Sequence, residues 1–166
     1  MSCKIHCPEF PAELNYFPYY EGQELQFINS QRNIQSFTIT NKENSESEVF
    51  GQNCKCLCYI FTYFNINSLS DSLSMRCEIN IDGRENVWGI NIDCHIEDNL
   101  RNKELLSIGV ELPDNKISYD EIDKYLEDTI IIENKNNKTV TKIVFVKNKG
   151  LVSYTTADGE EWKLVE

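Results

Sequence analysis

The stretch CKCLCYIFTYFN, residues 54–65, decides the fold of this chain. Its three cysteines, Cys54, Cys56 and Cys58, occupy alternate positions. In an extended chain alternate side chains share one face, so the three sulfur atoms are expected to line that face at a spacing of roughly 6.6 Å. Apolar residues continue on both faces toward the end of the stretch, which is typical of a strand in the middle of a β-sandwich or barrel.

The same stretch carries an aromatic stripe at Tyr59, Phe61 and Tyr63. These rings share the face opposite the cysteines. Such a stripe usually packs in a core, but it can also line a ligand cavity. Both interpretations stay open here, and the second makes the three residues candidate ligand-facing aromatics.

Outward from this strand, short extended runs alternate with polar turns, a pattern typical of an antiparallel β domain. The expected strands are 24–29, 34–41, 55–65, 75–81, 86–96, 105–112, 129–133, 139–147, 151–156 and 161–165. Asp-Gly pairs at 82–83 and 158–159 and the stretch 148–150 predict tight hairpins, since Asp-Gly supplies the positive φ values that such turns require. The polar stretch 43–53 is interpreted as a loop.

One short helix interrupts the strands, with Ser118 as its cap and Glu121 completing a capping box. Prolines in residues 1–20 predict an irregular lead with at most one helical turn near 11–15, whereas 21–166 form one domain. The sequence therefore predicts a mainly β protein, an antiparallel β-sandwich or open barrel with one short helix, behind a proline-rich tether.

Seven cysteines in 166 residues are dense for a reducing compartment. A disulfide from Cys7 to Cys54 or Cys56 would attach the lead to the domain and contribute roughly 4 kcal/mol in the chain-entropy model. For Cys77 and Cys94 we expect free thiols or a bridge to the strand of Cys54. A hairpin at residues 82–83 predicts that Cys77 and Cys94 are not directly opposite each other.

Charge and motifs exclude several classes of function. The chain has 16 basic and 27 acidic side chains, a net charge of -11, so we expect neither nucleic acid nor an anionic membrane surface as a partner. No tight cysteine knuckle predicts a metal site, and no phosphate loop or nucleophile elbow predicts a cofactor or catalysis. His95 follows Cys94 directly, but neighbours in a strand face opposite ways, so the two do not form a thiolate dyad.

A resemblance adds a location. It is carried by CPEFP at 7–11, by PY at 18–19 with EG at 21–22 and LQF at 25–27, by NCKC at 53–56, and by KGLV at 149–152 through DG at 158–159 to WKL at 162–164. Together these stretches resemble small uncharacterised lipoproteins of gut Bacteroidetes. The resemblance implies export, a lipid on Cys3 and a place on the outer membrane or cell surface, with membrane attachment through the lipid anchor alone. Exported proteins of that phylum also carry O-glycans at Asp-Ser/Thr before an apolar residue, which makes Ser72 and Thr129 candidates.

We therefore expect an envelope protein that is not an enzyme and acts as a binding or interaction module, its partner an unidentified ligand or another envelope protein. The alternatives are a hydrolase, which predicts a cleft with convergent carboxylates or His95, and a structural subunit of an envelope complex, which predicts an exposed apolar patch of several hundred Å².

Overall fold

The computed structural model describes residues 9–50, 56–69, 73–84, 87–98, 102–110, 124 and 126–166. Within these residues one antiparallel sheet of ten strands runs in the order β6-β5-β4-β3-β2-β1-β10-β9-β8-β7. The strands are β1 (Glu24–Ile28), β2 (Ile34–Phe50), β3 (Cys56–Ser68), β4 (Ser74–Arg84), β5 (Val87–Glu97), β6 (Lys103–Val110), β7 (Thr129–Glu133), β8 (Val140–Val146), β9 (Gly150–Thr156) and β10 (Glu161–Leu164). Each of the ten expected strands is confirmed.

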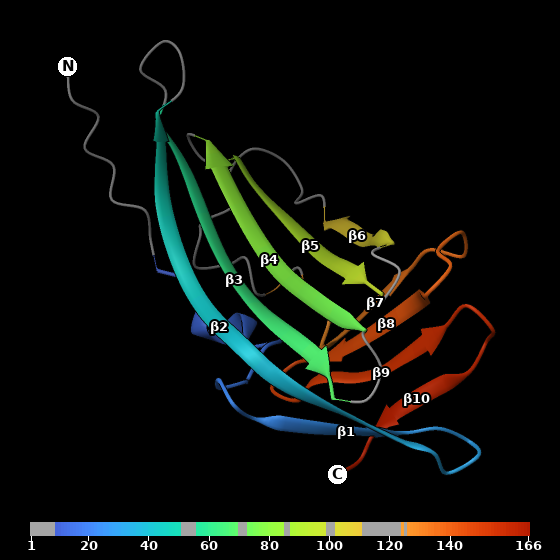
Figure 1. The fold of residues 1–166 in the computed structure, drawn as a ribbon. Helices are drawn as coiled ribbons and strands as arrows, with labels where there is room; N and C mark the ends of the chain where they lie inside the picture. The colour runs from blue at the N-terminus through green and yellow to red at the C-terminus, as the bar shows by residue number, and fades with distance from the viewer. Residues whose placement is uncertain are drawn as a thin grey trace.

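The sheet curls until it nearly closes into a barrel (Figure 1). The first and last strands pair with each other, since Phe27 of β1 lies opposite Leu164 of β10. The two edge strands, β6 and β7, come into contact, but in the described part of the chain no ladder joins them. The predicted mainly β, open-barrel architecture is therefore confirmed, and the opening lies between β6 and β7.

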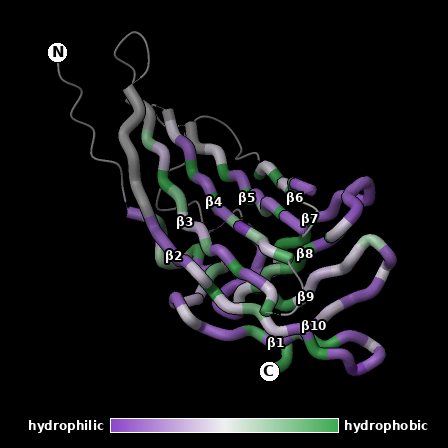
Figure 2. Tube along the Cα trace, in the orientation of Figure 1, coloured by the Kyte–Doolittle hydropathy of each residue, from purple (hydrophilic) through white to green (hydrophobic). Residues whose placement is uncertain are grey.

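The core fills the inside of this barrel. Along β3 the side chains of Ile60, Phe64 and Ile66 are fully buried, and the apolar residues of β4 and β5 continue the same inner surface. Polar residues alternate with them on the outside, so the tube of Figure 2 changes repeatedly between hydrophobic and hydrophilic along these strands. A period of two is expected of a sheet with one face on the core and one face in water.

Part of the proline-rich lead lies in the core. A single 3-10 turn, η1 (Ala12–Leu14), confirms the expected helical turn, and the aromatic residues after it point into the barrel. Phe17 packs edge-on against Phe64 with ring centroids 4.7 Å apart. The Tyr16 hydroxyl donates to the Glu127 carbonyl at 2.6 Å, and the Tyr19 hydroxyl accepts from the backbone N–H of Leu151. From η1 onward the lead is thus part of the folded body.

The turn before β9 shows how closely the lead is fitted. Gly150 has a φ of +87°, and a Cβ at this position would lie 2.1 Å from the Tyr19 hydroxyl oxygen. Glycine is required here for two reasons, its left-handed backbone and the space that the tyrosine occupies. The expected turns at 148–150 and at Asp158 and Gly159 are both confirmed, the second between β9 and β10.

The loop prediction for residues 43–53 is wrong for its first eight residues. Strand β2 continues to Phe50 and pairs with β3 along its whole length, with Glu43 opposite Tyr63 and Phe50 opposite Cys56. Asn, Lys, Glu and Ser have weak strand propensity, but an unpaired β3 would leave one backbone edge without hydrogen bonds. Pairing with β3 therefore overrides the local preference of this segment.

The predicted hairpin at Asp82 and Gly83 is also wrong. Both residues lie inside β4, with Gly83 opposite Trp88, and β5 begins at Val87. In this register the apolar residues of the two strands face one another, as in the pair Ile79 and Ile92, whereas a turn at 82–83 would place them opposite polar residues. Matching of the buried faces sets the register.

A consequence is that Cys77 and Cys94 are direct cross-strand partners, contrary to the prediction. Both are buried free thiols, which confirms one of the two expected alternatives. The helix expected after Ser118 falls outside the described residues except at Lys124 and Leu126, and Leu126 is buried in the core.

Candidate functional site

The aromatic stripe of β3 lies on the outside of the barrel. Phe61 is centred between Tyr59 and Tyr63, with ring centroids 5.5 Å from Tyr59 and 6.1 Å from Tyr63. The Phe61 and Tyr63 rings are nearly parallel, at an interplanar angle of 20°. The three rings therefore form a short ladder along the strand, on the face opposite the buried Ile60 and Phe64.

Beside this ladder, polar side chains of β4, β5 and β6 form a connected network. The Tyr59 hydroxyl donates to Asn80 Oδ1 at 2.6 Å and also lies 3.2 Å from Glu78 Oε1. Asn80 Nδ2 in turn donates to Asp93 Oδ2 at 3.4 Å, and the Ser107 hydroxyl donates to the other oxygen of the same carboxylate. The network crosses three strands and holds the first ring of the ladder in place.

The last ring of the ladder is held from both sides. The Tyr63 hydroxyl donates to Glu43 Oε2 at 2.7 Å and accepts from Asn41 at 3.2 Å, both on β2. From β4, the Arg76 guanidinium lies over the ring at 3.9 Å from its centroid and forms an ion pair with Glu78 at 3.0 Å. Tyr63 is thus covered by surface side chains of its neighbours rather than by the core.

Both tyrosine hydroxyls stay protonated well above neutral pH. Burial, with the nearby charge of Glu78 next, raises the pKa of Tyr59 to about 12. The hydrogen bond to Glu43 is the main cause that raises the pKa of Tyr63. Below that range the face presents neutral hydroxyl groups beside carboxylates, an arrangement that can both donate and accept hydrogen bonds.

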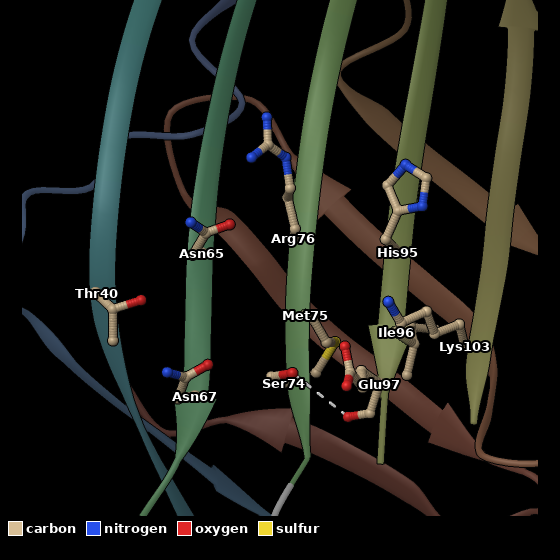
Figure 3. Close-up of a pocket in the computed structure, with 10 residues that line it drawn as sticks. All are labelled: Thr40, Asn65, Asn67, Ser74, Met75, Arg76, His95, Ile96, Glu97 and Lys103. Atoms are coloured by element: carbon tan, nitrogen blue, oxygen red, sulfur yellow. Dashed lines mark hydrogen bonds between the residues drawn. The ribbon is translucent and has the colours of Figure 1, made fainter. Parts of the chain in front are cut away.

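A groove of about 420 Å³ continues from this ladder along the outer surface (Figure 3). Asn65, Arg76 and His95 form one row across β3, β4 and β5, and Asn67, Ser74, Glu97 and Lys103 form the next row toward the ends of the strands. Arg76 belongs to both regions. We call the ladder, its polar network and this groove together the outer polar face.

The groove brings together residues that could do chemistry, but it does not link them. Ser74 donates to the Glu97 carbonyl oxygen at 3.5 Å, at the limit for a hydrogen bond. His95 is exposed, and among the described residues no hydrogen bond or ion pair joins it to a hydroxyl or a carboxylate. Nor do three His, Cys, Asp or Glu side chains in this part of the chain come together in a metal-binding group.

Several sequence candidates lie outside the described residues, namely Cys3, Cys7, Cys54 and Ser72, as does the side chain of Cys56. Cys58 is buried and is not a free thiol; its partner lies beyond the described side chains. The disulfide at Cys7, Cys54 or Cys56 therefore stays a prediction. Thr129, the other candidate for an O-glycan, is exposed at the start of β7.

The comparisons with known proteins leave the site to be argued from its own geometry. A scan of protein-family models, a search of curated proteins and a search of solved structures each found no match to this chain. Within the residues described above, no helix is both long and apolar enough to span a membrane.

Sequence reasoning found the three rings but missed the residues that hold them. Asn80, Asp93 and Arg76 are separated from the rings by up to 34 positions along the chain, and only the register of four strands brings them together. The usable signal was the alternation of polar residues with isoleucines in β4 and β5, which marks an outer face of unusual polarity beside an aromatic strand.

Proposed function

We propose that this protein is an exported, lipid-anchored binding module that holds a neutral glycan on its outer polar face. The observation that carries the proposal is the ladder of Tyr59, Phe61 and Tyr63 beside the polar groups of β4 and β5. A sugar ring has an apolar C–H face and a rim of hydroxyl groups. Aromatic rings suit the first, and carboxylates, amides and guanidinium groups suit the second.

The interior of the barrel is a poorer place for such a ligand. Leu14, Tyr16, Phe17 and Tyr19 of the lead belong to the buried core and fill the space between the sheet's two halves. A binding site inside would have to displace these side chains, and each buried aromatic ring stabilises the fold by several kcal/mol, about 3–5 by the cost of truncation. The outer polar face needs no such rearrangement.

Charge favours a neutral glycan over an acidic one. Carboxylates of Glu43, Glu78, Asp82 and Asp93 project from this side of the sheet, and Arg76 is the cation among them. With a net charge of -11 on the whole chain, an acidic polysaccharide would be repelled during approach. The proposed envelope location rests on the lipoprotein resemblance and on Cys3, and it would place the face where extracellular glycans occur.

The test is binding of the purified chain to a panel of neutral polysaccharides and oligosaccharides by affinity electrophoresis and calorimetry. Phe61→Ala removes the central ring and keeps both tyrosines with their hydrogen bonds. We expect at least a tenfold loss of affinity, which corresponds to about 1.4 kcal/mol. Asp93→Asn, which keeps the shape but not the charge, should weaken binding by a smaller factor.

Ile131→Ala is the matched control, because Ile131 is a 49% exposed apolar side chain on the distant strand β7. Its affinity should equal that of the unaltered chain. If no glycan in the panel binds, or if the Phe61 and Ile131 variants lose affinity equally, the outer polar face is not a glycan site.

A hydrolase is the second candidate, because His95 and Glu97 lie in the groove that continues the ladder. It predicts release of new reducing ends from a bound glycan, abolished by His95→Asn. Binding without any release over a long incubation would exclude this alternative for the glycans tested and leave the binding module.

A further inference from the structure

A second cavity lies on the inner side of β3, between this strand, β2 and the lead. It has a volume of about 280 Å³, and η1 lies beside β2 at this place (Figure 1). One wall is apolar and comes from the lead, from Phe10, Leu14 and Phe17 together with Pro11 and Ala12. The cavity is separate from the outer polar face because Thr62, which lines it, points inward between the outward Phe61 and Tyr63.

The opposite wall is polar and contains a single cation. Lys42 Nζ donates to Asn44 Oδ1 at 2.8 Å and to Thr62 Oγ1 at 2.5 Å, and Thr62 donates to Asn44 Oδ1 at 2.6 Å. Thr62 is 2% exposed, whereas Asn44 is exposed, so the cavity reaches solvent at the Asn44 side. Among the described side chains no carboxylate lies within ion-pair distance of Lys42.

This arrangement leaves the ammonium group without a counter-charge. Burial lowers the pKa of Lys42, since the group has lost part of its water and has gained only neutral acceptors. An amide and a hydroxyl oxygen solvate an ammonium less well than a carboxylate does, and charge-assisted hydrogen bonds are roughly twice as strong as neutral ones. An anion that enters the cavity would therefore gain a partner already positioned for it.

We propose that this cavity binds a small organic acid, with its carboxylate on Lys42 and its apolar body against Phe10, Leu14 and Phe17. The two walls set these requirements independently, charge from β2 and an apolar body from the lead. The volume admits a compact molecule such as an aromatic or short branched acid and is too small for a long fatty acid lying at full length. This site goes beyond the proposed glycan function and does not depend on it.

The test compares probes that differ in one property. Benzoate has both the charge and the apolar body, benzamide keeps the shape without the charge, acetate lacks the body, and inorganic phosphate has charge alone. Calorimetry on the full chain should give benzoate an affinity at least tenfold higher than that of each of the other three. This comparison needs no altered protein, so it holds even if a variant fails to fold.

Variants then locate the site. Lys42→Met keeps the length of the side chain and removes the charge, and it should weaken benzoate at least tenfold, while Lys42→Arg should restore most of the loss. Lys135→Met, in the exposed loop between β7 and β8, changes the net charge equally and should leave the affinity within twofold. Phe61→Ala should not change benzoate binding, which separates this test from that of the glycan proposal.

Three results would overturn the assignment. They are equal affinity for benzoate and benzamide, phosphate that binds as tightly as benzoate, and a Lys42→Met chain that binds benzoate as well as the unaltered one. Absence of heat with benzoate, phenylacetate and hexanoate at millimolar concentration would overturn it as well.

Discussion

The two faces of β3 contain similar residues and do different work. Inside, Ile60 and Phe64 are fully buried and contact the rings of the lead. Outside, Tyr59, Phe61 and Tyr63 are held by hydrogen bonds and by a guanidinium group at the surface. The difference teaches that an aromatic residue in a strand is assigned to core or surface by the side chains of neighbouring strands, since its own hydrophobicity is the same on either face.

The largest effect should come from truncating one ring on each face. Phe64→Ala removes a fully buried ring and should lower the free energy of unfolding by about 3–5 kcal/mol. Phe61→Ala removes a ring that is partly in water and should cost no more than about 1 kcal/mol. Urea unfolding followed by circular dichroism measures both, and equal losses would contradict the assignment of the two faces.

An intermediate effect is expected from Tyr19→Phe. The change deletes the hydroxyl that accepts the Leu151 N–H inside the barrel and leaves a buried donor without a partner. The expected cost is about 1–3 kcal/mol. Tyr20→Phe is the matched control because Tyr20 is 69% exposed, and it should change the unfolding free energy by less than about 0.5 kcal/mol. An unchanged stability in the Tyr19 variant would mean that the lead is not docked as described.

Tyrosines from both faces should make the fold sensitive to alkali. The pKa values of Tyr16, inside, and Tyr59, outside, are raised from 10.0 to about 12, in each case mainly by burial. Because the folded-state values lie above the unfolded ones, this contribution to stability is complete below pH 10 and is lost as the pH rises toward 12. The urea midpoint, measured across this range, should therefore fall. A constant midpoint would show that these hydroxyls titrate alike in both states.

The smallest effect on stability, and a test of the inner surface, concerns the thiols of Cys77 and Cys94. Burial, followed by the hydrogen bond from Cys77, raises the pKa of Cys94, and neither side chain is exposed. In the native protein both should react with an alkylating reagent at least about 1000-fold more slowly than after unfolding, since access requires opening of the core. Peptide mapping by mass spectrometry measures each cysteine separately, and rapid labelling of the native chain would contradict the closed core.

Sequence reasoning succeeded where the local signal and the fold agree. Alternation around Ile60 and Ile79, and positive φ at Gly159, led to the right strands and to the last hairpin. It failed at Glu43, where polar residues continue a strand because β3 needs a partner, and at Gly83, where matched apolar faces outweigh a good turn pair. In both places a distant or neighbouring strand contributes more free energy than the local preference does.

The candidate sites divide in the same way. The aromatic stripe could be found in the sequence because its period of two is a property of one strand. The side chains that surround it, and the pairing of Lys42 with Thr62 on the inner side, depend on which strands are neighbours and in which register. The sequence by itself determined that the chain would form an antiparallel β domain with an aromatic central strand. Only the tertiary structure decided which face of that strand meets the core, because that choice belongs to the whole curled sheet and to the lead that fills it.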